Sequence, residues 1–305
     1  MADGARWIDL LDPTRDEVER ESPVELHWSA LDQVLAPPPE RATARPTFEG
    51  HGTYVFGVLL VPVAVPAEDR IFYQEVDFVL TPGFALTIRK TPPGDEPFSI
   101  ETVQEACDAH GTPSSGMIVY HLVDEVAEGY LELLDSLHLE IDELEDGIET
   151  WPSVQVRTRL ANLRQDILQI RRTLSPTREA VRRVVDGRVD VGDQDVFDRP
   201  LELSFAHAHD KLLHAADSLD SARDLVSSAR DFQQSRIAQE QNDIVRKLTV
   251  IASLVLVPTF IVGVYGQNFD HMPELNWRLG YAFSWAVILV TTLAQLAFFR
   301  WKKWI

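Results

Sequence analysis

LTVIASLVLVPTFIVGVY, residues 248–265, and GYAFSWAVILVTTLAQLAFF, residues 280–299, are the two stretches of this sequence that decide its fold. Neither contains a charged side chain. At a rise of about 1.5 Å per residue, each is about long enough to cross a hydrocarbon core of about 30 Å. The alternative, two buried helices of a soluble core, fits less well because such helices seldom lack charge over this length. The sequence therefore predicts two membrane-spanning helices joined by a short loop, residues 266–279.

Basic residues flank the two spans on the sides away from the loop. Arg246 and Lys247 precede the first span, and three more basic residues lie in the tail 300–305. Arg278 is the only Lys or Arg in the loop itself. By the positive-inside rule, both termini lie in the cytoplasm and the loop lies outside. We therefore expect a multi-pass protein of the cell membrane, in contact with lipid along both spans.

The overall charge is strongly negative, with 28 basic against 48 acidic side chains and a net charge of −20. This balance argues against a nucleic-acid partner, because the sequence has no excess of basic side chains to neutralise phosphates. A negatively charged protein is instead suited to attracting cations. The single cysteine, Cys107, excludes an intrachain disulfide and fits a reducing cytoplasm. Residues 1–115 show no nucleophile with its base and no glycine-rich phosphate loop after a strand, so we do not expect an enzyme.

Residues 1–115 have the pattern of a small α/β domain. WIDLLDPT, residues 7–14, predicts a short strand followed by a helix start, where Thr14 and Glu17 have the spacing of a capping box. Further segments rich in Val, Ile, Phe and Tyr are bounded by Pro and Gly, and a helical segment follows them. They predict strands at 54–65, 71–80 and 84–89 and a helix at 100–110.

Residues 116–190 predict an antiparallel helical hairpin whose two arms carry opposite charge. The segment 118–149 is rich in Asp and Glu, and no basic residue occurs between Lys90 and Arg157. The next helix is rich in arginine. A solvated, charged surface explains much of this pattern. The other interpretation is that the carboxylates concentrate or sense divalent cations, and both remain open.

Residues 198–265 predict one long stalk helix that runs into the first span. Apolar residues follow each other at alternating spacings of four and three, and Pro and Gly are absent from 201 to 257. The seam consists of Leu201, Phe205, Ala208, Leu212, Ala215, Leu219, Ala222, Val226 and Ala229. Beyond it, the same register mixes oxygen-bearing and apolar side chains, as expected of an ion path with a hydrophobic gate. The predicted pore-lining residues on this stripe are Asn242, Val245, Thr249, Leu256 and Thr259.

The loop between the spans begins Tyr265-Gly266-Gln267-Asn268-Phe269, with Met272-Pro273-Glu274 just beyond. At this position, the motif resembles the signature of the CorA family of magnesium transport proteins. Residues 7–14 resemble the entry to that family's cytoplasmic domain, and QNDIVRKL, residues 241–248, resembles its approach to the pore. The family's middle loop residue is typically Met, whereas here it is Gln267, so this GQN variant leaves the ion selectivity open.

The resemblance implies an architecture and a mechanism. The fold class is an α+β cytoplasmic domain followed by long helices and two C-terminal transmembrane helices, assembled as a funnel-shaped homopentameric channel. Asn268 from the subunits would form a ring at the mouth, with Gly266 and Gln267 completing the selectivity loop. Amide oxygens can hydrogen-bond the hydration shell of Mg²⁺, which dehydrates reluctantly. Asp270 and Glu274 would raise the local cation concentration.

By the same resemblance, cytoplasmic Mg²⁺ bound between subunits would hold the closed state, and its depletion would open the pore. His207, Asp210, His214 and Asp217 share one face of the stalk helix. Polar residues belong on that face in any case, because it lies opposite the apolar seam. The resemblance places a regulatory site between this helix and a neighbour's N-terminal domain, with Asp210 and Asp217 as the candidate ligands.

Three functions remain open at this stage. The first is a channel for Mg²⁺, which would also pass Co²⁺ or Ni²⁺. The second is a proton-coupled zinc transporter resembling the ZntB branch of the family, where the middle loop residue also differs from Met. The third is a non-conducting membrane sensor of cations that signals through the acidic hairpin.

Overall fold

The computed structural model describes residues 4–38, 46–65, 70–109, 111, 113–189, 191, 196–267, 272 and 277–304. The chain divides into two compact units, Met1–Ala229 and Arg230–Ile305. The boundary falls inside helix α6 (Arg199–Tyr265), so this helix contributes to both units. The sequence predicts residues 198–265 as one helix, and the structure has α6 as one helix. Its buried residues up to Ala229 belong to the hydrophobic core of the first unit.

A five-stranded sheet forms the base of the first unit, in the order β1-β5-β4-β3-β2. The strands are β1 (Arg6–Leu11), β2 (Thr47–Gly50), β3 (Val55–Val65), β4 (Arg70–Thr81) and β5 (Phe84–Arg89). Neighbours pair antiparallel except β1 and β5, which are parallel. The predictions for β3, β4 and β5 are confirmed. The four-residue β2 was not predicted, because its sequence TFEG lacks an alternating pattern and the strand forms by pairing with β3.

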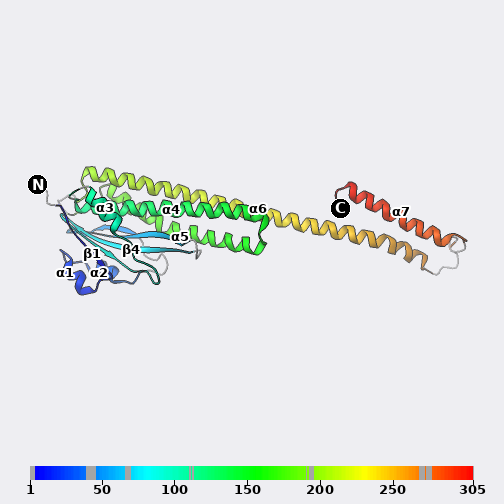
Figure 1. Cartoon of the computed structure of the whole chain (residues 1–305), viewed down its shortest axis with the longest axis horizontal. Helices are drawn as coiled ribbons and strands as arrows, with labels where there is room; N and C mark the ends of the chain where they lie inside the picture. The colour runs from blue at the N-terminus through cyan, green and yellow to red at the C-terminus, as the bar shows by residue number, and fades with distance from the viewer. Residues whose placement is uncertain are drawn as a thin grey trace. The chain divides into compact units, whose positions relative to one another are not determined.

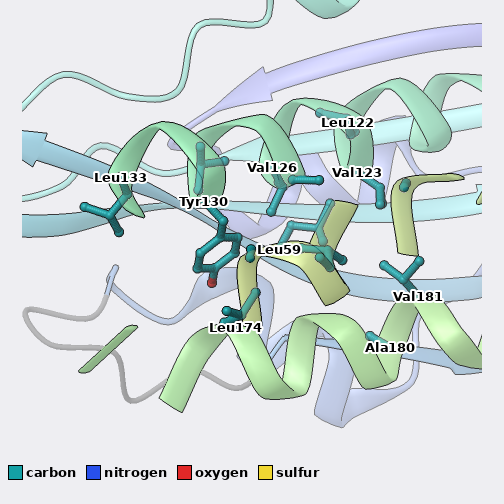
Figure 2. Close-up of a cluster of buried hydrophobic side chains, with 14 of the residues drawn as sticks. Leu59, Leu122, Val123, Val126, Tyr130, Leu133, Leu174, Ala180 and Val181 are labelled. Atoms are coloured by element: carbon teal, nitrogen blue, oxygen red, sulfur yellow. The ribbon is translucent and has the colours of Figure 1, made fainter. Parts of the chain in front are cut away.

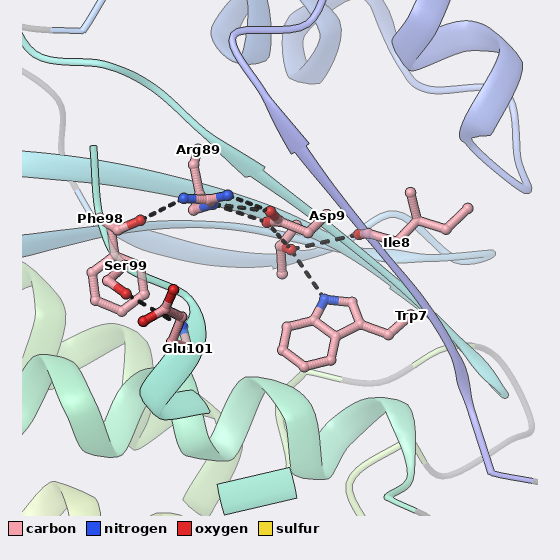
Figure 3. A network of polar contacts seen from close by, with 8 residues as sticks. Trp7, Ile8, Asp9, Arg89, Phe98, Ser99 and Glu101 are labelled. Carbon is pink, nitrogen blue, oxygen red and sulfur yellow. Dashed lines mark hydrogen bonds and ion pairs between the residues drawn. The ribbon is translucent and has the colours of Figure 1, made fainter. Parts of the chain in front are cut away.

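Side-chain hydrogen bonds fasten the parallel edge strand β1 to β5 (Figure 3). The Arg89 guanidinium donates to the Asp9 carboxylate at 2.7 Å from Nη2 and to the Phe98 carbonyl at 2.7 Å from Nη1. The Thr87 hydroxyl donates to Asp9 Oδ1 at 2.7 Å and accepts from Trp7 Nε1 at 3.0 Å. Because β1 is far from β5 in sequence, these bonds define where the N-terminal strand joins the sheet.

Helices cover both faces of this sheet (Figure 1). One face carries α4 (Ser115–Thr150), α5 (Ser153–Val185) and the first part of α6, and the other carries α1 (Arg15–Glu21) and α2 (Trp28–Leu35). α3 (Glu101–Ala109) packs against α4. The capping box of α1 is present, with the Glu17 carboxylate accepting the Thr14 backbone N–H at 2.8 Å. Helix α2 was not predicted.

The main hydrophobic core lies between the sheet and the long helices. Leu59 of β3 packs with Leu122 and Tyr130 of α4 and with Leu174 and Val181 of α5 (Figure 2). Every residue of the predicted α6 seam, from Leu201 to Ala229, is buried in the same cluster. The alternating spacing therefore identified the core face of this helix correctly.

The second unit consists of the rest of α6 and helix α7 (Gly280–Trp301). Among the described residues, α6 and α7 are the helices long and apolar enough to cross a membrane. Only 6% of the apolar window of each is buried. Near its end, α7 is anchored by Phe299, which is buried and stacks on Trp304 with ring centroids 5.8 Å apart.

Candidate ion pathway

The apolar part of α6 has two different faces. Val250 is buried, and Ser253, Val257 and Ile261 are half-buried, on the side that meets α7. The predicted pore-lining residues Asn242, Val245, Thr249, Leu256 and Thr259 are all exposed. At roughly 100° of rotation per residue, the centres of the two sets lie about 110° apart around the helix, so they form two neighbouring faces. The predicted stripe is therefore part of the surface of α6 that α7 leaves open.

The two threonines of this stripe present oxygen acceptors. The Thr249 hydroxyl donates to the Val245 carbonyl at 2.8 Å, and the Thr259 hydroxyl donates to the Val255 carbonyl at 2.7 Å. Each hydroxyl hydrogen is thus committed to the helix, while the oxygen keeps a lone pair for another donor. The water molecules of a hydrated cation are donors of this kind. Such a surface suits a hydrated cation better than an anion.

Leu256 lies between the two threonines and is 68% exposed. An apolar side chain at this depth contributes no ligand to an ion. When several copies of it surround one axis, they form a constriction that water leaves readily, which is how hydrophobic gates close. The stripe therefore combines ion-compatible positions with a position suited to closure.

Helix α6 ends where the loop motif begins. The Gly266 N–H donates to the Val262 carbonyl at 3.0 Å and the Gln267 N–H to the Val264 carbonyl at 3.4 Å, so both still bond to the last turn. Both residues are exposed. The other loop residues of the sequence prediction, Asn268, Asp270 and Glu274, lie outside the described residues, and their roles remain predictions.

Comparison with known proteins identifies the family. The family model described as "CorA-like Mg2+ transporter protein" matches residues 2–303. The chain belongs to this CorA-like family. The resemblance drawn from the loop and the two spans is therefore confirmed, and the apolar part of α6 together with α7 are the membrane-spanning helices of a family member.

Relatives and solved structures agree with this membership. The cobalt/magnesium transport protein CorA of Thermotoga maritima is 31% identical over 282 residues, which cover 92% of this chain and 77% of the relative. The structure of the CorA magnesium transporter from Methanocaldococcus jannaschii matches with a TM-score of 0.78 at 21% identity, covering 98% of this chain and 91% of that one. The ZntB cytoplasmic domain from Vibrio parahaemolyticus matches less well, with a TM-score of 0.54 at 14% identity over 76% of this chain and 88% of that domain. The two structural likenesses show a shared fold.

The candidate regulatory residues of this CorA-like chain are exposed and separate. Asp210 and Asp217 both lie on the exposed side of α6, away from the buried seam. Asp210 lines a shallow groove with His207 and His214 of α6 and Asp135 of α4, but Asp217 does not line it. In the part of the chain that the structure describes, no three His, Cys, Asp or Glu side chains gather closely enough to hold a metal. A regulatory site on α6 remains a prediction that needs ligands from a second subunit.

The acidic helix α4 is partly neutralised by its neighbours. Lys211 of α6 donates to Asp124 Oδ1 at 2.7 Å and to Glu128 Oε1 at 2.5 Å. Burial, followed by the negative charges of Glu132, Asp124 and Glu128, raises the pKa of Glu125 above its ordinary value. The part of this shift that comes from the neighbouring carboxylates reflects negative charge gathered on α4, which attracts cations. A structural role and a cation-concentrating role both fit this arrangement.

A buried ionic cluster in the first unit was missed by sequence reasoning. Lys90 Nζ lies 2.5 Å from Glu75 Oε1 and 3.0 Å from Asp77 Oδ2, and it donates to the Gln33 carbonyl of α2 at 2.7 Å. All three charged side chains are at most 4% exposed. Burial lowers the pKa of Lys90, but Asp77 and Glu75 outweigh this and raise it. The sequence feature that could have indicated this cluster is the pair Glu75 and Asp77. They are two residues apart in β4, so they point to the same face of a strand that is mostly apolar around them.

Stability should depend on pH through Asp77. Burial raises the pKa of Asp77 from its ordinary value of 3.8 to about 8. The folded state therefore holds a proton that the unfolded state releases, so this contribution to stability is present below about pH 4 and is lost as the pH rises to about 8. We expect Asp77→Asn to lack this loss, because its amide does not titrate.

The measurement compares thermal unfolding of the detergent-solubilised wild type and Asp77→Asn across that pH range. The wild type should lose stability relative to the variant with a slope approaching about 1.4 kcal/mol per pH unit. Glu75 remains as the counter-ion of Lys90 in both proteins. Parallel pH profiles for the two would show that Asp77 does not titrate in this window.

Proposed function

We propose that this protein conducts divalent cations, chiefly Mg²⁺ and also Co²⁺ or Ni²⁺, through a pore lined by the open face of α6. The observation that carries the proposal is the stripe of threonine oxygens and apolar side chains on the part of α6 that α7 leaves exposed, leading into the GQN loop. Membership of the CorA-like family supports divalent-cation transport. The Thermotoga maritima relative is named a cobalt/magnesium transport protein.

The ion passes in hydrated form. Mg²⁺ holds its water tightly, so a path that stripped the ion would have to offer a full set of replacement ligands. Thr249 and Thr259 instead offer acceptors for the waters of the hydration shell. Asn268, with the adjacent backbone of Gly266, supplies neutral oxygens at the mouth, which bind the hydrated ion weakly enough for it to leave.

Several copies of the chain enclose this path. A single α6 face cannot surround an ion, and in one chain the stripe remains exposed, with Leu256 at 68% and Val245 at 60%. We infer a homopentamer with the α6 helices around the axis, Asn268 of each subunit in a ring at the mouth, and both termini in the cytoplasm. Asp270 and Glu274 lie near the mouth and raise the local concentration of cations.

Gating by cytoplasmic Mg²⁺ completes the proposal. The ion binds between subunits, with Asp210 and Asp217 as candidate ligands, and holds the closed state. Since α6 carries both these residues and the pore stripe, a shift at the subunit interface can be passed to Leu256 along one helix. Loss of the bound ion loosens the interface, and the apolar constriction opens.

Zinc transport is the second candidate function, and the observation that favours it is Gln267. The GQN loop departs from the family's usual Met, as does the loop of the ZntB branch. The fold does not separate the two functions, because the soluble domains of a ZntB and a CorA match with similar TM-scores of 0.54 and 0.57. We rank zinc below magnesium because the Thermotoga maritima relative is named a cobalt/magnesium transport protein.

The test is ion entry into proteoliposomes of the purified protein, measured separately for Mg²⁺ and Zn²⁺. Wild type should admit Mg²⁺, and Asn268→Ala should reduce that rate by about tenfold or more, because the ring of amide oxygens is lost. The matched control is Gln267→Met, which places the family's usual residue immediately before Asn268. This variant should keep Mg²⁺ flux. Zn²⁺ entry without Mg²⁺ entry, especially under a pH gradient, would show that the protein is a zinc transporter. No flux of either ion would leave a cation sensor as the remaining function.

A further inference from the structure

One polar side chain of α7 reaches across to α6 inside the apolar region. Gln295 Nε2 donates to the backbone carbonyl of Ser253 at 3.3 Å. Its other polar atom, Oε1, is shielded from solvent and has no hydrogen-bond partner among the described residues. Polar side chains are costly within a bilayer and are retained there mostly where they serve a function. The position of Gln295 therefore indicates that this side chain has a specific role.

The contact lies in the turn of α6 that precedes its interior proline, Pro258. Pro258 has no N–H, so the carbonyl of Leu254, four residues earlier, receives no hydrogen bond from its own helix. Ser253 is the residue immediately before Leu254. Membrane helices tolerate an interior proline because side chains of neighbouring helices support the freed backbone. Gln295 bonds the Ser253 carbonyl, which is next to the freed one, so it supports the same turn without replacing the missing bond.

The other hydrogen-bonding side chains described in α7 act within their own helix. The Thr291 hydroxyl donates to the carbonyls of Val287 at 2.8 Å and Ile288 at 3.0 Å, and the Ser284 hydroxyl donates to Tyr281 at 3.3 Å. Gln295 differs because its hydrogen bond to Ser253 links the two spans. Thr291, one turn away on the same helix, is therefore a matched control for the loss of a polar group.

We propose that Gln295 is a positioning residue, which fastens α7 to α6 at the proline turn and thereby sets the orientation of the pore segment beyond Pro258. That segment carries Thr259 and ends in Gly266 and Gln267. A hydrogen bond at the proline turn determines how this segment faces the axis, although Gln295 itself does not touch the ion. The inference rests on the proposed function, because it assigns a role within the same pore.

The first measurement is Mg²⁺ entry into proteoliposomes containing Gln295→Leu or Thr291→Val. Leucine keeps most of the volume and removes the donor, so the segment beyond Pro258 loses its support. We expect Gln295→Leu to lower the rate about 3- to 15-fold, the range that corresponds to measured interhelical hydrogen bonds. Thr291→Val should stay within about twofold of wild type, because its bond is internal to α7. Equal rates for the two variants would overturn the proposal.

Gln295→Glu separates positioning from simple packing. A protonated carboxylic acid carries an O–H that can donate to the Ser253 carbonyl, whereas a carboxylate has no donor. The rate of Gln295→Glu relative to wild type should therefore be near one in acidic buffer and fall toward that of Gln295→Leu in alkaline buffer. A ratio that does not change with pH would contradict a role for the donor.

A third readout does not depend on transport. In a Cys107→Ala background, a cysteine introduced by Val257→Cys lies on the half-buried side of α6, and its rate of labelling by a thiol reagent in detergent reports separation of α6 from α7. Gln295→Leu should raise this rate several-fold and Thr291→Val should not. If the wild type carries no ion but this difference is found, the proposed function fails while the helix contact stands. If ion flux is present but the labelling rates are equal, the positioning role fails alone.

Discussion

Replacing Lys90 by methionine is expected to destabilise the first unit by about 3–5 kcal/mol, because it leaves the buried Glu75 carboxylate without its counter-ion, beside the buried Asp77 carboxyl group. Lys90 is in contact with Glu75, Asp77 and the Gln33 carbonyl, and it is 4% exposed. For a unit of this size the loss corresponds to a fall of about 10 °C in the unfolding midpoint. The measurement is thermal unfolding of the full chain in detergent, followed by circular dichroism.

The control replaces the entire cluster rather than one member. The triple variant Lys90→Met, Glu75→Met and Asp77→Leu removes all three charges and fills the space with apolar side chains. Buried ionic clusters replaced in this way are often as stable as before or more stable. The triple variant should therefore recover most of the stability that Lys90→Met loses. A Lys90→Met midpoint equal to that of wild type would show that the cluster contributes nothing.

The second large effect is expected from Leu256→Asn. In the proposed pore, Leu256 of each subunit faces the axis and forms the apolar constriction, and a polar amide there would keep the constriction wet. Mg²⁺ entry under conditions that close the wild-type pore, with high Mg²⁺ on the cytoplasmic side, should rise about tenfold or more, since each subunit loses the burial of a leucine side chain. Proteoliposomes loaded with Mg²⁺ provide this condition.

Leu256→Met is the matched control for that prediction. Methionine is apolar and similar in volume, so the constriction should still exclude water and the pore should still close. A leak in Leu256→Met as large as that in Leu256→Asn would show that packing, rather than polarity, decides closure. A tight Leu256→Asn channel would place the gate at another residue of the stripe.

Local patterns in the sequence were sufficient for many elements. The apolar seam of α6 follows from the helical period, and the capping box at Thr14 and Glu17 marks the start of α1. Strands β3, β4 and β5 follow from their composition and from the turns between them. In contrast, α2 and β2 were missed because each is short and is stabilised by its neighbours. α2 begins at a histidine cap that accepts the Ser29 N–H at 3.3 Å, a weaker signal than Ser or Asp.

The candidate site divides in a similar way. The period of α6 predicted which of its residues would share a face, because that geometry depends on the helix alone. Whether that face is open depends on where α7 packs, and the structure places α7 against the neighbouring face that carries Ser253. The contact between Gln295 and Ser253 joins residues that are 42 positions apart, so no local sequence pattern predicts it.

The sequence by itself determined the two spans, the loop motif and its family resemblance, the helical periods and the charge, because each depends on residues close together in the chain. Only the tertiary structure decided that Lys90, Glu75 and Asp77 form one buried cluster beneath α2, that β1 joins the sheet through Asp9 and Arg89, and that α7 leaves the predicted pore-lining residues of α6 exposed. These features arise when distant segments pack together. Their energies come from burial and pairing of groups that the sequence keeps far apart.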